Sequence, residues 1–309
     1  MVMSEYERMK NTLLPMLTAL LMSSQLLAQD STGIVRDTIK TDTIVSVNEP
    51  VTKIMIQESS QKKEPIYKIK PGIDIPVTAV TTATTLYGFS KIYNKERLTV
   101  DEVESLDPRN VNRFDRSATK HYSERATKVA DIFFYGSQPL PLLFLLDKRT
   151  RKDFPKLVLL YLETMGATGV PYVSAVYFGD RYRPYTYNPE TPIDFKLRGG
   201  SRNSFYAGHP ALVATSTFFM ATVFSDYHPE SKFKWLFYTL AGAATAGTAI
   251  GRYLGGRHFP SDLIIGVTMG TASGLIIPRI HRNKKLADRK TAIMPFFGES
   301  NGLTLVHKF

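Results

Sequence analysis

The sequence predicts an all-α fold, a helical bundle of five or six membrane-embedded helices that follows a largely disordered N-terminal linker. The mean hydropathy of the 309 residues is only −0.14, yet the apolar residues are concentrated in long segments. Charged residues, Gly and Pro mark the connections between these segments. The five stronger segments lie near residues 129–146, 157–178, 210–225, 235–250 and 263–278.

Residues 1–29 have the pattern of a signal peptide. Lys10 precedes an apolar core that extends from Leu13 to Leu27, and Met9 is a candidate start. Because polar residues interrupt this short core, we expect it to be cleaved. An uncleaved membrane anchor is the alternative.

Two polar regions flank the predicted helical domain, which covers residues 73–285. Residues 30–72 are rich in Thr, Asp, Lys and Val and show no helical periodicity, so we interpret them as a linker. Residues 286–309 alternate around a turn at Ser300–Gly302, which predicts a terminal hairpin.

Each of the five segments is close to the ~20 residues that a membrane-spanning helix needs. The stretch Leu240–Gly251 consists mainly of Gly, Ala and Thr, which favours close helix packing in a membrane. A soluble bundle with buried helices is the alternative. Residues 73–93 are more polar, with Asp74 and Lys91, and we expect them to lie on or against the membrane. If they cross it instead, six helices start from the cytoplasm and the signal is not functional.

Basic residues predict the orientation of the helices. The connection 147–156 and the tail after Pro278 are both rich in Lys and Arg, so the positive-inside rule places them in the cytoplasm. The connections 179–209 and 251–262 then share the opposite side. We therefore expect a protein of a bacterial-type inner membrane whose functional face is periplasmic.

The formal net charge of +11 favours an anionic partner such as phosphate or acidic lipid. We expect no nucleic-acid partner, because the sequence has no basic stripe interleaved with aromatic residues. The absence of cysteine excludes disulfides, thiol catalysis and cysteine-ligated metals.

Five polar residues lie at the ends of different apolar segments, and alternation across a membrane brings these ends to one face. Two helix N-termini there favour anions, and arginines bind tetrahedral oxyanions through paired hydrogen bonds. One histidine can attack phosphorus while an aspartate fixes its tautomer, and a second histidine can protonate the leaving group without a metal. The five residues are Arg183, His209, Arg252, His258 and Asp262.

These residues resemble the motifs of the type 2 phosphatidic acid phosphatases, which share a pocket with the vanadium-dependent haloperoxidases. The family motifs are K-x6-RP, PSGH and SR-x5-H-x3-D. The third is present as GRYLGGRHFPSD, the second ends in Gly208 and His209, and the first keeps Arg183 and Pro184. The resemblance extends over residues 75–280.

The resemblance implies a role for each matching residue. His258 is expected to be the nucleophile that forms a phosphohistidine, Asp262 to pair with it, and His209 to be the general acid. Neither a metal nor another cofactor is implied. The phosphate oxygens are expected to bind Arg183, Arg252 and the backbone N–H of Gly208.

Three side chains of the family motifs are missing. Val176 replaces the lysine, Ala207 replaces the serine of PSGH, and Gly251 replaces the serine before the arginine. Arginines in the same connections are candidate replacement cations, Arg181 first among them. The other two are Arg202 and Arg257.

The sequence thus predicts a metal-independent membrane phosphatase that hydrolyses a phosphomonoester or diphosphate of a lipid, with the lipid and the membrane as partners. A soluble periplasmic acid phosphatase of the same superfamily is one alternative. A catalytically weakened anion-binding membrane protein is another, motivated by the three missing side chains. Those losses also disfavour a vanadate haloperoxidase.

Overall fold

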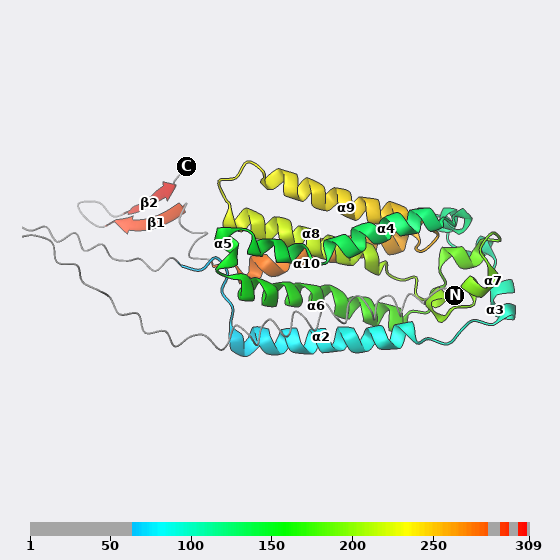
Figure 1. Ribbon diagram of the computed structural model, residues 1–309. Coiled ribbons are helices and arrows are strands. Elements are labelled where there is room, and N and C mark those ends of the chain that lie inside the picture. Colours follow the sequence, from blue (N-terminus) through cyan, green and yellow to red (C-terminus); the bar gives the residue numbers. More distant parts are fainter. Residues whose placement is uncertain (1–63, 284–290, 297–301, 308–309) are drawn as a thin grey trace, which may run out of the picture. The chain divides into compact units, whose positions relative to one another are not determined.

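The computed structural model describes residues 64–283, 291–296 and 302–307 (Figure 1). The predicted signal peptide and most of the predicted linker lie outside the described residues. Within the described part the chain is mainly helical, which confirms the helical class. Two short strands, β1 (Thr291–Phe296) and β2 (Gly302–His307), add an antiparallel pair in which Thr291 lies opposite His307.

Long helices of the described region form a bundle (Figure 1). They are α2 (Pro71–Tyr93), α4 (Glu124–Ser137), α6 (Phe154–Phe178), α8 (Gly208–Tyr227), α9 (Lys234–Leu254) and α10 (Pro260–His281). Short helices lie in the connections. These are α3 (Val100–Glu104), η1 (Pro108–Asn110), η2 (Arg116–Lys120), η3 (Leu140–Leu145), α5 (Lys148–Arg151), η4 (Pro184–Tyr187), α7 (Ile193–Lys196) and η5 (Gly199–Arg202).

The predicted apolar segments coincide with helices, with one correction. The segment 129–146 is not one helix, because α4 begins at Glu124 and ends at Ser137. Pro139 and Pro141 follow, and a proline has no N–H to donate and disfavours the helical conformation of the residue before it. The chain continues instead as the 3₁₀-helix η3.

Helix α8 lies at the centre of the bundle and packs against α6, α9 and α10. Small residues allow the closest approach: a Cβ on Gly270 of α10 would lie only 2.0 Å from the carbonyl oxygen of Ala211 on α8. Close backbone contact of this kind is typical of helices that pack through small residues.

Helix α2 lies along α6 over most of its length. Gly166 and Gly169 of α6 face Thr81 and Thr85 of α2, and Gly88 of α2 faces α6 in turn. Helix α2 is therefore part of the bundle and runs beside α6.

The bundle has two chemically different ends. We call the end that holds Arg183, His209, Arg252 and His258 the motif end. We call the other end, with the connection 147–156, the basic end. Contacts between the connections define the basic end: Arg149 donates to the carbonyl oxygen of Tyr227 at 3.0 Å, and Arg282 pairs with Asp226 at 3.3 Å. The two Lys- and Arg-rich connections therefore lie on one side, as the sequence predicts.

By length and composition alone, one helix of the described region, α10, is apolar enough to cross a membrane.

Candidate active site

The five predicted residues lie at the motif end, each at a helix terminus or in a connection. Arg183 immediately precedes η4, His209 lies in the first turn of α8, and Arg252 lies in the last turn of α9. His258 lies in the connection between α9 and α10, and Asp262 lies in the first turn of α10.

A sharp turn presents His258. Gly256 has a φ of +65°, a conformation that glycine adopts without strain, and a Cβ there would lie 2.1 Å from the carbonyl oxygen of His121. This turn brings Arg257 and His258 back under the end of α9, where both side chains are buried. The glycine pair in GRYLGGRHFPSD is therefore required by the backbone.

The imidazole of His258 has a defined tautomer. Its side chain is 1% exposed, and Nδ1 lies 2.7 Å from the carbonyl oxygen of Ser204. A carbonyl oxygen only accepts, so Nδ1 carries the hydrogen and Nε2 of the neutral ring carries the lone pair. The geometry leaves the nucleophilic nitrogen facing away from Ser204.

The environment of His258 favours the neutral ring. Burial lowers the pKa of His258 well below its ordinary value, and the positive charges of Arg183 and Arg252 lower it further. The hydrogen bond to Ser204 opposes this shift but does not outweigh it. The imidazole therefore stays neutral at neutral pH.

Asp262 is connected to His258 through Ser204. The carboxylate is fully buried, and its Oδ2 accepts hydrogen bonds from Ser204 Oγ at 2.6 Å and from the backbone N–H of Phe259 at 3.0 Å. Oδ2 lies 4.0 Å from His258 Nδ1, too far for a hydrogen bond. The family resemblance implies a direct pair, but in this structure Ser204 receives the histidine N–H on its carbonyl and donates its hydroxyl to Asp262.

Arg181 binds carboxylates instead of pointing toward the histidines. Its guanidinium pairs with Asp262 Oδ1 and, at 2.7 Å, with Asp115 Oδ2, and it donates to Ser261 Oγ at 3.0 Å. The guanidinium also lies 4.4 Å from the centroid of the Phe259 ring. This geometry argues against the predicted phosphate-binding role and favours a role in holding Asp262.

Asp115 is a second buried carboxylate in this network. It accepts hydrogen bonds from Ser261 N at 2.9 Å, Ser261 Oγ at 2.7 Å and Asn112 Nδ2 at 2.7 Å. Burial by itself raises the pKa of Asp115, but these hydrogen bonds and Arg181 outweigh burial and hold the pKa below its ordinary value. Asp115 is therefore ionised and fixes the position of Arg181.

Three other arginines surround His258. Arg183, Arg252 and Arg257 each exert a positive potential on its imidazole. Arg183 Nε is buried and has no hydrogen-bond partner, and Arg257 lies over the rings of Tyr185 and Phe195. These guanidinium groups give the imidazole of His258 a positive electrostatic environment. Arg202 is occupied elsewhere, by Glu102 and Asp180.

His209 shares a carboxylate with Arg252. Its Nε2 lies 3.8 Å from Asp131 Oδ1, the same oxygen that pairs with Arg252. The ring packs 4.4 Å from the Phe134 ring, and His258 lies within electrostatic reach of it. The preceding Gly208 begins α8, where backbone N–H groups have no partner within the helix.

Packing explains one of the three missing motif side chains, the serine that Gly251 replaces. A Cβ on Gly251 would lie 2.8 Å from the carbonyl oxygen of Ala126 and from the Cβ of Ala130, so α4 leaves no room for a serine. Ala207 and Val176 are fully buried.

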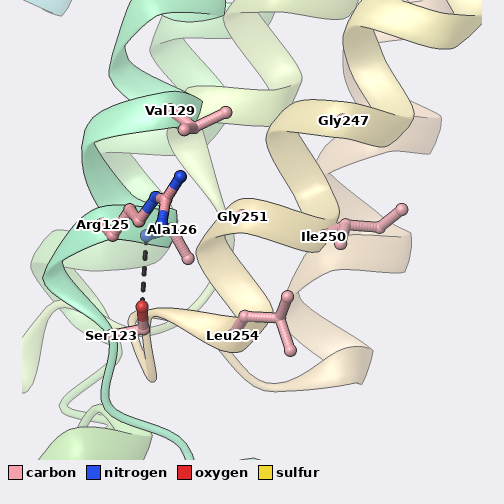
Figure 2. A pocket seen from close by; sticks show the side chains of 8 residues that line it. All are labelled: Ser123, Arg125, Ala126, Val129, Gly247, Ile250, Gly251 and Leu254. Atoms are coloured by element: carbon pink, nitrogen blue, oxygen red, sulfur yellow. Dashed lines mark hydrogen bonds between the residues drawn. The ribbon is translucent and has the colours of Figure 1, made fainter.

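The α4–α9 contact also borders a depression of about 310 Å³ (Figure 2). Its lining is Ser123, Arg125, Ala126, Val129, Gly247, Ile250, Gly251 and Leu254.

Sequence reasoning missed Ser204, Asp115 and Asp131. Asp131 had a signal, because it is a single carboxylate within an apolar segment. Ser204 and Asp115 lie in polar connections and carry no pattern that distinguishes them from their neighbours.

Residues 157–286 match the model of the PAP2 superfamily. The match contains Arg183, His209, Arg252, His258 and Asp262, and it confirms the resemblance.

Other comparisons add little to the PAP2 match. No curated protein matches the sequence. Among solved structures, the chain is similar to a transmembrane PAP2-type phosphatidylglycerolphosphate phosphatase from Bacillus subtilis, at 18% identity and a TM-score of 0.40. The similarity covers 70% of this chain and 96% of that one.

Proposed function

We propose that the protein is a PAP2-type phosphatase that transfers a phosphoryl group to His258 and then to water. The single observation that carries this proposal is the tautomer of His258. Its Nδ1–H donates to the carbonyl oxygen of Ser204, so the lone pair is on Nε2, and the positive charges of Arg183, Arg252 and Arg257 act on the same ring. A neutral nucleophile beside several guanidinium groups is the arrangement that attack on a phosphate ester requires.

In the first step, Nε2 of His258 forms a bond to phosphorus while the bond between phosphorus and the leaving oxygen breaks. The electron pair of that bond goes to the leaving oxygen, which takes a proton from protonated His209. Asp131 lies 3.8 Å from Nε2 of His209, but burial and the positive charges of Arg252, His258 and Arg183 lower the pKa of His209 well below its ordinary value. In this proposal the negative charge of the bound phosphate ester offsets those positive charges and allows His209 to carry the proton. The products of this step are a phosphohistidine and the free alcohol, or the free monophosphate when the substrate is a diphosphate.

In the second step, water attacks phosphorus and His209, now neutral, takes a proton from it. The bond between Nε2 and phosphorus breaks, its electron pair returns to His258, and inorganic phosphate leaves. Over both steps one water is consumed and no net proton is gained by the protein.

Asp262 supports the charge that His258 acquires in the intermediate. A ring that carries hydrogen on Nδ1 and phosphorus on Nε2 is positive, and the carboxylate of Asp262 lies 4.0 Å from Nδ1. Because Asp262 is buried, this attraction is little screened by water. Ser204 and Arg181 hold the carboxylate in place.

Arg257 is our choice for the cation that replaces the missing lysine. It acts on the imidazole of His258, it is buried, and it has no carboxylate partner among the ion pairs of the described residues. Its Nε contacts only the Thr127 hydroxyl, at 3.4 Å, a long hydrogen bond. Arg181 and Arg202, by contrast, both bind carboxylates.

The surface of the bundle supports the proposal of a lipid substrate in a membrane. The interior is unusually polar, as in the 2.6 Å hydrogen bond between the hydroxyls of Thr168 and Thr215, while large apolar side chains face outward from several helices. Such a surface is typical of a membrane or partner interface. The most exposed include Val80, Tyr87, Ile132, Trp235, Leu240, Ile250, Ile264, Ile276 and Ile280.

In this proposal the basic end faces the cytoplasm and the motif end faces the periplasm, by the positive-inside rule. Residue 64 lies near the basic end, because Lys68 N donates to the carbonyl oxygen of His281. The chain then enters the bundle from the cytoplasmic side, which favours the alternative of six spanning helices over cleavage of a signal peptide.

The experiment is phosphate release by the purified protein in detergent micelles. Phosphomonoesters of glycerolipids and a polyprenyl diphosphate are compared with a soluble aryl phosphate, and His258→Ala is the control. We expect faster turnover of a lipid and none by the control. Equal turnover of the soluble ester, together with extraction from membranes without detergent, would favour the soluble acid phosphatase. Vanadate binding without any turnover would favour the anion-binding protein that the missing side chains motivate.

A further inference from the structure

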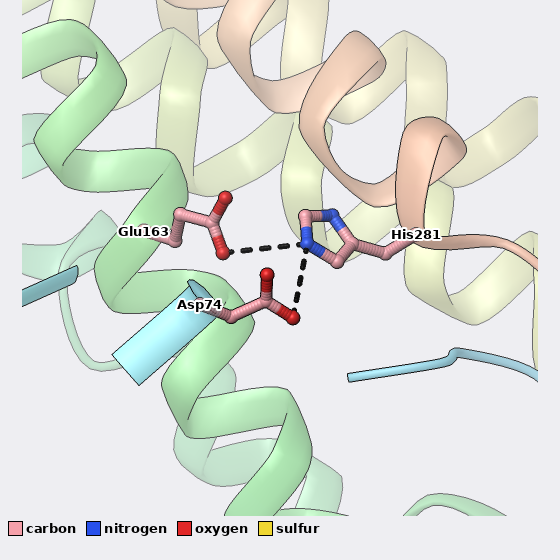
Figure 3. A group of neighbouring side chains, drawn as sticks. All are labelled: Asp74, Glu163 and His281. Carbon is pink, nitrogen blue, oxygen red and sulfur yellow. Dashed lines mark ion pairs between the residues drawn. The ribbon is translucent and has the colours of Figure 1, made fainter. Parts of the chain in front are cut away.

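At the basic end, far along the helices from His258, three ionisable side chains converge from three helices (Figure 3). They are Asp74 of α2, Glu163 of α6 and His281 at the end of α10, with side chains that are 8%, 12% and 10% exposed. One nitrogen and one oxygen of each carboxylate lie within 4.8 Å of one another.

The ring of His281 is oriented like that of a metal ligand. Its Nδ1 lies 2.9 Å from the carbonyl oxygen of Ile277, so Nδ1 carries a hydrogen and donates it. The lone pair of the neutral ring is then on Nε2, which faces both carboxylates in Figure 3. Metal-binding histidines commonly donate their other ring N–H to a backbone carbonyl in this way.

The distances within the group fit a shared cation better than hydrogen bonds. Nε2 lies 3.4 Å from Glu163 Oε2 and 3.6 Å from Asp74 Oδ2, and both exceed the usual 2.7–3.2 Å of an N–H···O bond. Ligands that each lie about 2.1 Å from a tetrahedral ion are separated by roughly 3.4 Å.

The carboxylates of Glu163 and Asp74 are also in environments that favour cation binding. Glu163 Oε2 is buried and has no hydrogen-bond partner, which is costly for a carboxylate oxygen unless a cation binds it. Asp74 Oδ2 accepts the backbone N–H of Lys70 at 2.6 Å, an outer contact that fixes its direction.

We propose that Asp74, Glu163 and His281 bind a divalent transition-metal ion of the Zn²⁺ class, with water as a fourth ligand. One imidazole and two carboxylates are ligands that Zn²⁺ takes in proteins. The ion joins α2 to α6 and α10 at the end of the bundle opposite His258. It stabilises the packing of α2 and takes no part in phosphoryl transfer, so this inference does not depend on the proposed function.

The test is calorimetric titration of the purified full-length chain with Zn²⁺ after removal of bound metal by a chelator. We expect one tight site per chain. In Glu163→Gln and His281→Gln the affinity falls by at least the roughly 100-fold that even an outer contact can contribute. His228→Gln is the matched control, because His228 lies at the same end and pairs with a single carboxylate, Asp147. It leaves the tight site unchanged.

Two further measurements distinguish this site from binding at the motif end and from misfolding of a variant. A double variant, His209→Ala with His258→Ala, retains the site, which excludes binding at the motif end. X-ray absorption of the Zn²⁺-loaded wild-type chain shows one imidazole and otherwise oxygen ligands, and needs no variant to fold. Absence of a tight site in the wild type would overturn the proposal. Undiminished binding by Glu163→Gln would overturn it as well.

Discussion

Both ends of the bundle carry an arginine–carboxylate pair, and the two pairs differ in the burial of the arginine. At the basic end, Arg149 pairs with Glu230 while both side chains are more than half exposed, at 53% and 62%. At the motif end, Arg252 is 1% exposed and pairs with Asp131 beside His209. Water can therefore solvate the carboxylate of Glu230 if Arg149 is lost. The guanidinium of Arg252, by contrast, is shielded from water.

This difference in burial determines which charges can contribute strongly to catalysis. An exposed ion pair contributes little, because water and salt screen both partners. Buried charges interact strongly and must be satisfied by fixed neighbours. Ser204 and Asp115 supply such neighbours at the motif end, and the following predictions compare matched residues from the two ends.

The largest contrast is expected between two histidines. His258→Asn removes the nucleophile and lowers phosphate release on the order of 10⁴-fold or more. His228→Asn, at the basic end, leaves phosphate release within roughly twofold, because His228 pairs with Asp147 and stacks on Phe224, at the end of the bundle opposite His258. Initial rates with the best lipid substrate measure both. Similar losses in the two variants would erase the distinction between the ends.

The next contrast concerns two arginines. Arg252→Lys keeps the charge but loses the planar fork, and we expect kcat/KM to fall about 10²- to 10³-fold, the usual effect of losing one stabilising donor. Arg149→Lys keeps a surface charge and leaves kcat/KM unchanged. Steady-state kinetics on the same substrate measures kcat/KM for both variants. Full activity of Arg252→Lys would contradict a phosphate-binding role for Arg252.

A smaller effect is expected for Arg181, and it appears in stability. Arg181→Met leaves Asp262 and Asp115 buried without their cation, which costs about 2–4 kcal/mol because the guanidinium itself is partly exposed. Arg149→Met costs below about 1 kcal/mol. Thermal unfolding measures both. Vanadate affinity of folded Arg181→Met stays within roughly threefold, and a larger loss would restore Arg181 as a phosphate ligand.

The smallest effect is a shift in pH dependence. Burial, Arg183 and Arg252 lower the pKa of His258, and Arg257 contributes to the same shift. The neutral nucleophile therefore persists as the pH falls below the ordinary histidine value of about 6.5, and activity is lost only at lower pH. Arg257→Gln removes one positive charge, raises the pKa of His258 and moves the acidic limb of kcat/KM to higher pH. An unmoved limb would place Arg257 away from the site.

Much of this arrangement could be predicted from the sequence. Apolar segments located the helices, and the alternation of helix directions brought Arg183, His209 and His258 to one end. The spacing of GRYLGGRHFPSD fixed the third motif. These features are local or follow from helix direction alone, so a single sequence reveals them.

The remaining features depend on tertiary contacts that no local pattern encodes. Arg181 lies two residues before Arg183, yet its side chain pairs with Asp115, 66 positions away in sequence. Ser204 receives His258 through its backbone, which any residue could do. The position of α2 along α6 depends on glycines of α6 that meet threonines of α2, and hydropathy does not report such contacts.

The most direct test of the central claim is to look for the phosphoryl group on His258. The chain is mixed with a radiolabelled substrate, quenched within one turnover in alkali, digested and examined by mass spectrometry. We predict one alkali-stable, acid-labile phosphoryl group per active chain, on the peptide that contains His258 and attached to Nε2. Turnover of the substrate with no labelled histidine, or with the label on another residue, would contradict the account.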